Sequence, residues 1–198
     1  MSLDIFANAG QALLLTVLFT LLVGSFVRDT FRHKLVVVVL LAVCMLVPLH
    51  GLTVAQWLRS VVGDLSIIAL VIFTNILIKR LFDIRILSPL SRQYLLRGVA
   101  LVGVLLYPFA LGFGSVDPYH FGYAPSWMSV LLILASIACW VTGMRDLAVV
   151  LLLPLLAFNL QILESVNLWD YVLDPVLFMY ALAQSVTFLL TDRLKIKV

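Results

Sequence analysis

Seven apolar segments, separated by short polar connections, constrain the fold of this chain more than any other feature. They span residues 9–27, 35–52, 61–78, 98–114, 127–143, 147–162 and 176–191. A helix needs about 20 mostly apolar residues to cross a bilayer. The mean hydropathy is +1.17 and only 12% of the residues are charged, against about 25% in soluble domains. We therefore predict an all-α polytopic membrane protein: one domain, residues 1–198, with seven transmembrane helices.

The charged residues alternate with these segments. If all seven cross the membrane, 12 of the 13 Lys and Arg residues fall on one side, with Arg59 the exception. Six of the ten acidic residues fall on the other side. Basic loops face the cytoplasm, so we expect the N-terminus outside and the C-terminus in the cytoplasm. The short loops fit the cytoplasmic (inner) membrane of a bacterium.

Several connections carry local signals for helix ends. Thr53 and Gln56 form a capping-box pattern, which predicts an interfacial helix after Thr53. Ser88-Pro89 is typical of an N-cap and a first helical position, and Asp174-Pro175 repeats this pattern. Asn167 is expected to cap a short helix. The Thr142-Gly143 pair predicts a tight turn between two antiparallel helices.

The connection between the third and fourth segments is the most basic part of the chain. Its cations are Lys79, Arg80, Arg85, Arg92 and Arg97. Cations near a bilayer surface attract anionic lipid headgroups, at about 1 kcal/mol each. We expect this loop to bind membrane lipids, with an acidic protein partner as the alternative. The basic residues sit at predicted helix ends, so we expect no nucleic acid as a partner.

The opposite face holds a loop, residues 115–127, that mixes acidic, aromatic and proline residues with one histidine. The candidate catalytic residues are Asp117, His120 and Glu164. The candidate ligand-binding residues are His50, Tyr119, Tyr123 and Asp170. The alternative is structural, because aromatic residues form interfacial belts and Asp caps helices. The two outer histidines, His50 and His120, have no metal-binding spacing, so we predict no metal.

The remaining polar residues give no cofactor motif. A retinal site needs a buried lysine, and segment 176–191 has none. A haem needs two histidines in facing helices, and only His50 lies near a span. The amides Asn75, Asn159, Gln161 and Gln184 are expected to hydrogen-bond between helices. We therefore expect no cofactor.

Three functions fit these features. The first is an accessory or scaffold subunit of a larger membrane complex, in cell-envelope glycan or lipid handling. The second is a carrier or flippase for an amphiphilic substrate. The third is a membrane-embedded enzyme that uses Asp117, His120 or Glu164 at the outer face. The first is favoured because the sequence shows no catalytic constellation, so we lean against an enzyme.

Overall fold

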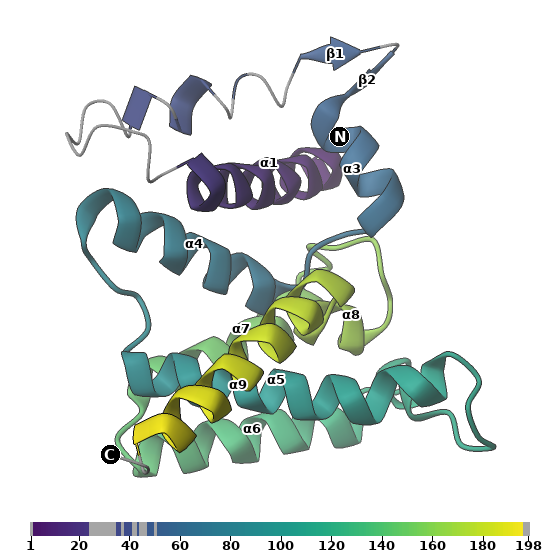
Figure 1. Ribbon diagram of the computed structural model, residues 1–198. Coiled ribbons are helices and arrows are strands. Elements are labelled where there is room, and N and C mark those ends of the chain that lie inside the picture. Colours follow the sequence, from purple (N-terminus) through teal and green to yellow (C-terminus); the bar gives the residue numbers. More distant parts are fainter. Residues whose placement is uncertain are drawn as a thin grey trace.

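The computed structural model describes residues 2–23, 35–36, 38–40, 43, 47–49 and 51–195, and most of these are helical (Figure 1). The α-helices are α1 (Ser2–Val23), α3 (Val54–Val62), α4 (Ile67–Phe82), α5 (Pro89–Ala110), α6 (Ser126–Val141), α7 (Arg145–Asn159), α8 (Leu168–Val172) and α9 (Pro175–Lys195). A 3-10 helix, η1 (Pro118–Gly122), follows α5. Strands β1 (Pro48–Leu49) and β2 (Leu52–Thr53) pair antiparallel.

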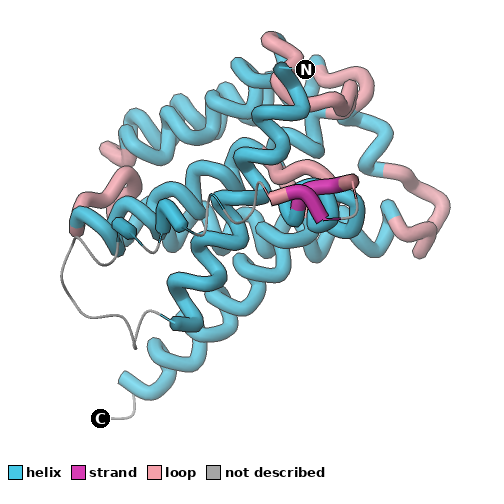
Figure 2. The backbone as a smooth tube through the Cα atoms, turned by 90° about the horizontal axis from the view of Figure 1, so that it is seen from above, coloured by secondary structure: helices cyan, strands magenta, loops and turns pink. Residues whose placement is uncertain are grey.

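The helices form two groups that meet at α4. In Figure 1, α1 and α4 lie above α5, α6 and α7, and α9 runs diagonally across α5. The most extensive helix contacts are between α6 and α7 and between α5 and α9, while α1 packs on α3 and α4. Seen from above in Figure 2, the β1–β2 pair is the one departure from helix and loop among the described residues.

The prediction of seven transmembrane helices is wrong. In the described part of the chain, only α5 is both long and apolar enough to cross a bilayer. Segment 61–78 is divided between α3 and α4, and the helices of segments 127–143 and 147–162 have 16 and 15 residues. Segment 35–52 is described only in part, without residues 37, 41–42, 44–46 and 50, and its last residues belong to β1 and β2 rather than to a helix. The predicted orientation depended on seven crossings and is withdrawn with them.

The error has a local physical cause. Segment 61–78 was treated as one span because it is apolar, but Gly63 adopts a φ of 80°, which ends α3. Ser66 then caps α4 by accepting a hydrogen bond from the backbone N–H of Ala69. Caps and turns set helix length, whereas apolar composition only shows that the segment avoids water.

The predicted local signals are confirmed. The Thr53 hydroxyl accepts from the Gln56 N–H at 3.2 Å, and the Gln56 side chain accepts from the Thr53 N–H at 2.7 Å, which completes the capping box of α3. Ser88 caps α5 and Asn167 caps α8. Asp174 precedes Pro175 and accepts from the Leu177 N–H at 2.9 Å. The turn at Gly143, with φ 85°, joins α6 to α7.

The core is centred on α4. Ile68, Ile72 and Phe73 of this helix are at most 3% exposed and belong to one apolar cluster with Leu96 of α5 and Leu177 of α9. A polar contact also joins two helix starts, because the buried Asp174 accepts from the Ser66 hydroxyl at 2.6 Å. The start of α9 is therefore fixed to the start of α4.

Much of the outer surface is apolar. Leu101 and Leu105 on α5 are 62% and 59% exposed, and Leu131 and Leu134 on α6 are 66% and 56% exposed. Apolar side chains gathered on a surface in this way indicate contact with a membrane or with a protein partner.

Candidate functional site

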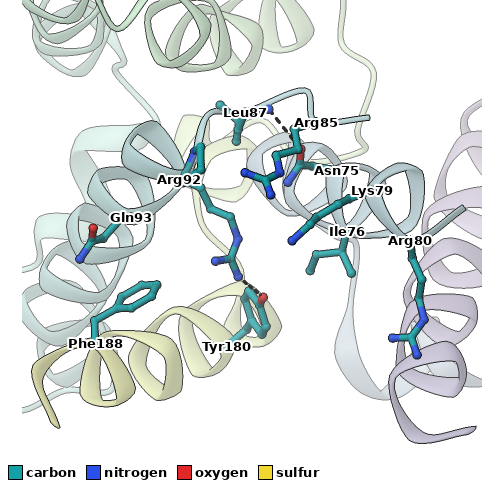
Figure 3. Close-up of a pocket in the computed structure, with 11 residues that line it drawn as sticks. Asn75, Ile76, Lys79, Arg80, Arg85, Leu87, Arg92, Gln93, Tyr180 and Phe188 are labelled. Carbon is teal, nitrogen blue, oxygen red and sulfur yellow. Dashed lines mark hydrogen bonds between the residues drawn. The ribbon is translucent and has the colours of Figure 1, made fainter. Parts of the chain in front are cut away.

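A basic pocket of about 610 Å³ lies between the end of α4, the start of α5 and α9 (Figure 3). Four cationic side chains line it: Lys79, Arg80, Arg85 and Arg92. None of its lining residues is acidic. The structure thus brings four of the five predicted headgroup residues to one cavity.

The end of α4 supplies the first wall of the basic pocket. Lys79 and Arg80 occupy the last turn of the helix, where the partial negative charge of the helix dipole favours cations. The helix ends at Asp83, which adopts the left-handed conformation with φ 56°. The chain reverses there and leads through Arg85 to α5.

The linker from Asp83 to Ser88 is held by Asn75. This amide is buried, and its Oδ1 atom accepts hydrogen bonds from the backbone N–H groups of Ile86, at 2.8 Å, and Leu87, at 3.1 Å. Both bonds fix the linker against α4. Arg85 and Leu87 consequently line the basic pocket, as Figure 3 shows.

Arg92 and α9 form the far wall. The Arg92 Nη2 atom donates to the Tyr180 hydroxyl at 2.6 Å and to Gln184 Oε1 at 3.3 Å. Its guanidinium carbon lies 5.9 Å from the centre of the Tyr180 ring. The fifth predicted residue, Arg97, lies farther along α5, with its guanidinium carbon 5.9 Å from the Phe188 ring centre. Both acceptors of Arg92 are neutral, so its charge is not compensated there.

The charge of the basic pocket is therefore unbalanced. Among the described residues, no carboxylate forms an ion pair with Lys79, Arg80, Arg85 or Arg92. Cations with N–H donors but no carboxylate are suited to phosphate and other oxyanions. The cavity lies within the range of about 300–1,000 Å³ that holds small ligands.

The start of α5 is anchored from the side of α7. Asp146 accepts from the Ser88 N–H and from the Ser91 hydroxyl, each at 2.6 Å. Burial alone would raise the pKa of Asp146, but the hydrogen bonds from Ser91 and Ser88 outweigh it and lower this pKa. Asp146 is thus ionised at neutral pH and holds the first turn of α5.

The predicted outer-face residues have separate partners. Asp117 caps η1 by accepting from the Tyr119 N–H at 3.0 Å. His120 is exposed, with its ring centre 6.3 Å from that of Tyr123. Glu164 pairs with Arg59 at 2.9 Å. Within the described residues, no hydrogen bond or ion pair joins Asp117, His120 and Glu164 to one another, and their catalytic roles stay predictions.

Two of the predicted ligand-binding residues do meet. The Tyr119 hydroxyl donates to Asp170 Oδ1 at 2.7 Å, and the pKa of Tyr119 is raised by burial and by this neighbouring carboxylate. Asn167 supports the same loop by donating to the Tyr119 carbonyl at 3.1 Å. His50 lies outside the described residues. No group of three potential metal ligands is close enough to hold an ion in the part of the chain that the structure describes.

Sequence reasoning missed the contribution of α9 to the basic pocket. Tyr180, Gln184 and Phe188 follow one another at four-residue spacing and so share a helix face. That spacing was a usable signal, but nothing local connects it to Arg92. Comparisons with protein-family models, curated proteins and solved structures find no match to this chain.

Proposed function

We propose that this protein is membrane-associated and binds anionic lipid headgroups in the basic pocket. Its role would be that of an accessory subunit in a larger complex for cell-envelope lipid or glycan handling. One observation carries the proposal: Lys79, Arg80, Arg85 and Arg92 line a single cavity that has no acidic lining residue.

The length of α5 supports a headgroup ligand. This helix continues for 18 residues beyond Arg92, which is about 27 Å at 1.5 Å per residue. The hydrocarbon core of a bilayer is about 30 Å thick. If α5 crosses the membrane, its basic start therefore lies at the level of the lipid phosphates. Location in a bacterial cytoplasmic membrane stays a prediction.

The exposed face of α6 supports the accessory role. Trp127 and Val141, at its two ends, are 77% and 79% exposed, and Leu131 between them is 66% exposed. Surfaces of this kind are covered by lipid or by a partner subunit. A scaffold subunit needs such a surface in addition to its lipid site.

The test is native mass spectrometry of the full chain after gentle extraction. We expect a retained anionic lipid, and we expect its loss in the double variant Arg85→Glu, Arg92→Glu. The single variant Arg85→Glu is compared with the matched control Arg145→Glu, which reverses one charge as well, at an exposed residue that does not line the basic pocket. Loss of lipid in the control to the same extent would reduce the effect to overall charge and contradict the proposal.

A co-purifying protein would test the accessory role in the same spectra. We expect a partner at fixed stoichiometry. If the chain always appears alone, in every mild detergent, the accessory role is contradicted. This result would not affect the proposed lipid site.

A carrier of an amphiphile is the second candidate, and a groove favours it. About 680 Å³ of space lies between α1, α4 and α7, lined almost entirely by apolar residues. It reaches Ile86, the neighbour of Arg85 in the linker. A lipid-scrambling assay in proteoliposomes tests this candidate with Leu153→Trp, which fills the groove, against Leu152→Trp on the exposed neighbour. Equal scrambling by both variants would contradict it.

A further inference from the structure

We infer that the ligand of the basic pocket carries a phosphomonoester or a diphosphate, and so at least two negative charges. This inference rests on the proposed headgroup site and narrows its chemistry. Most anionic bilayer lipids are phosphodiesters with a single negative charge. The geometry of the cations separates the two classes.

Three cationic heads converge on one space. In Figure 3, the ammonium of Lys79 and the guanidinium groups of Arg85 and Arg92 point toward the same part of the cavity. They come from α4, the linker and α5, so no helix repeat forces them together. Arg80 also lines the cavity, but its guanidinium is turned away from the other three in Figure 3.

Charge complementarity then favours a dianion. A phosphodiester would leave two of the three converging positive charges without a counter-charge. A phosphomonoester carries about −1.5 to −2 at neutral pH and has three acceptor oxygens. Those oxygens match one acceptor to each cationic head, and a diphosphate offers more. In the described part of the chain, Arg92 donates its side-chain hydrogen bonds to the neutral Tyr180 and Gln184, so no carboxylate there competes with the ligand for it.

The walls favour a ligand larger than phosphate. Ile76 and Phe188, both half-buried, line the cavity beside the cationic groups. The cavity of about 610 Å³ far exceeds one phosphate group. An apolar or ring-bearing portion next to the phosphate fits these side chains, as in a phosphorylated lipid or a free phosphate ester with an organic substituent.

The experiment compares two lipids that differ in phosphate chemistry. The full chain in neutral detergent is titrated with phosphatidic acid, a monoester, and with phosphatidylglycerol, a diester, and the bound fraction is measured by native mass spectrometry at neutral pH. One extra charge-assisted hydrogen bond should give phosphatidic acid about a tenfold or greater advantage in Kd.

Single substitutions assign that preference to the basic pocket. Arg85→Gln and Arg92→Gln should each weaken the binding of phosphatidic acid until its Kd is about equal to that of phosphatidylglycerol. Arg145→Gln, the matched control, removes the same charge at an exposed residue outside the basic pocket and should keep the preference. A preference that falls equally in all three variants would overturn the inference, because general electrostatics would then explain it.

The remaining outcomes separate the inference from the proposed function. Equal binding of both lipids would overturn the inference that the ligand is a dianion, but it would be consistent with a site for anionic lipids. Binding of neither lipid above phosphatidylcholine would overturn the headgroup site itself. Inorganic diphosphate is the competitor: displacement of phosphatidic acid supports recognition of a free phosphate ester, and persistence of the lipid supports recognition of a lipid phosphomonoester or diphosphate.

Discussion

Asp146 of α7 accepts a hydrogen bond from the hydroxyl of Ser91 of α5 at 2.6 Å, and the same carboxylate accepts a second one from the Ser88 N–H. Two elements separated by more than 50 residues are joined at the point where α5 begins. We expect Asp146→Asn to destabilise the protein by about 1–3 kcal/mol, because one charged acceptor is replaced by a neutral amide. Thermal unfolding in detergent measures this.

The control for Asp146→Asn is Asp83→Asn. Asp83 is exposed, and Asn tolerates its left-handed backbone conformation. We expect an unchanged Tm in this variant. An equal loss in both variants would mean that net charge, rather than the Ser91 contact, sets the stability.

The same carboxylate predicts a pH dependence. The pKa of Asp146 is lowered in the folded state, so the folded protein holds the ionised form more strongly than the unfolded chain, whose Asp pKa is about 3.9. Its contribution is complete above that unfolded value and is lost as the pH falls through the lower folded value. The Tm difference between wild type and Asp146→Asn should therefore be constant near neutral pH and shrink in acid. A difference that grows in acid would contradict this sign.

Close packing of α5 against α9 leaves no room for a side chain at Gly103. A Cβ atom on Gly103 would lie 2.2 Å from Cδ2 of Phe178, which is far inside contact distance. We expect Gly103→Ala to cost about 1–3 kcal/mol through overpacking, measured as a lower Tm. The second substitution Phe178→Leu should recover part of this loss.

Gly98 is the control on the same helix. Nothing lies within 4 Å of a Cβ atom at this position. Gly98→Ala should raise stability by about 0.5–1 kcal/mol, because alanine loses less backbone entropy in a helix. A loss at Gly98 as large as the loss at Gly103 would show that the Phe178 contact is not the cause.

Asn75 predicts a link between stability and binding. Asn75→Ala leaves the N–H groups of Ile86 and Leu87 without their acceptor, and an unpaired buried donor costs about 1–3 kcal/mol. We expect a lower Tm and weaker lipid binding, because Arg85 loses its fixed position. Asn159→Ala is the control, since Asn159 is exposed and its one side-chain hydrogen bond among the described residues is to the Leu155 carbonyl in its own helix. Unchanged lipid binding in Asn75→Ala would contradict the idea that the linker conformation fixed by Asn75 is needed for binding.

The sequence predicted helix starts better than helix lengths. Caps such as Thr53 and Ser88 act over three residues, so their partners can be read nearby. Ser66 also caps its helix over three residues, through the Ala69 N–H, but this cap lies inside segment 61–78, which apolar composition presented as one span. The second contact of the Ser66 hydroxyl, with Asp174 108 residues away, has no local pattern that predicts it.

The site was predictable in part because most of its cationic residues are close together in the sequence. Lys79 to Arg97 are close in sequence, and their shared role in attracting anions follows from charge alone. Asn75 was expected to hydrogen-bond between helices, but it binds the linker. Tyr180 joins Arg92 only because α9 packs along α5, which tertiary contacts decide.

The place of Tyr180 and Phe188 on α9 has a consequence for biosynthesis. Domains fold progressively as the chain leaves the ribosome, and α6 and α7 can pair as soon as their short turn has been made. The basic pocket has no far wall until translation has passed Phe188. A ligand that binds only when the complete basic pocket is present stabilises only full-length chains. Bound lipid would thus protect complete molecules from membrane proteases and leave truncated ones exposed.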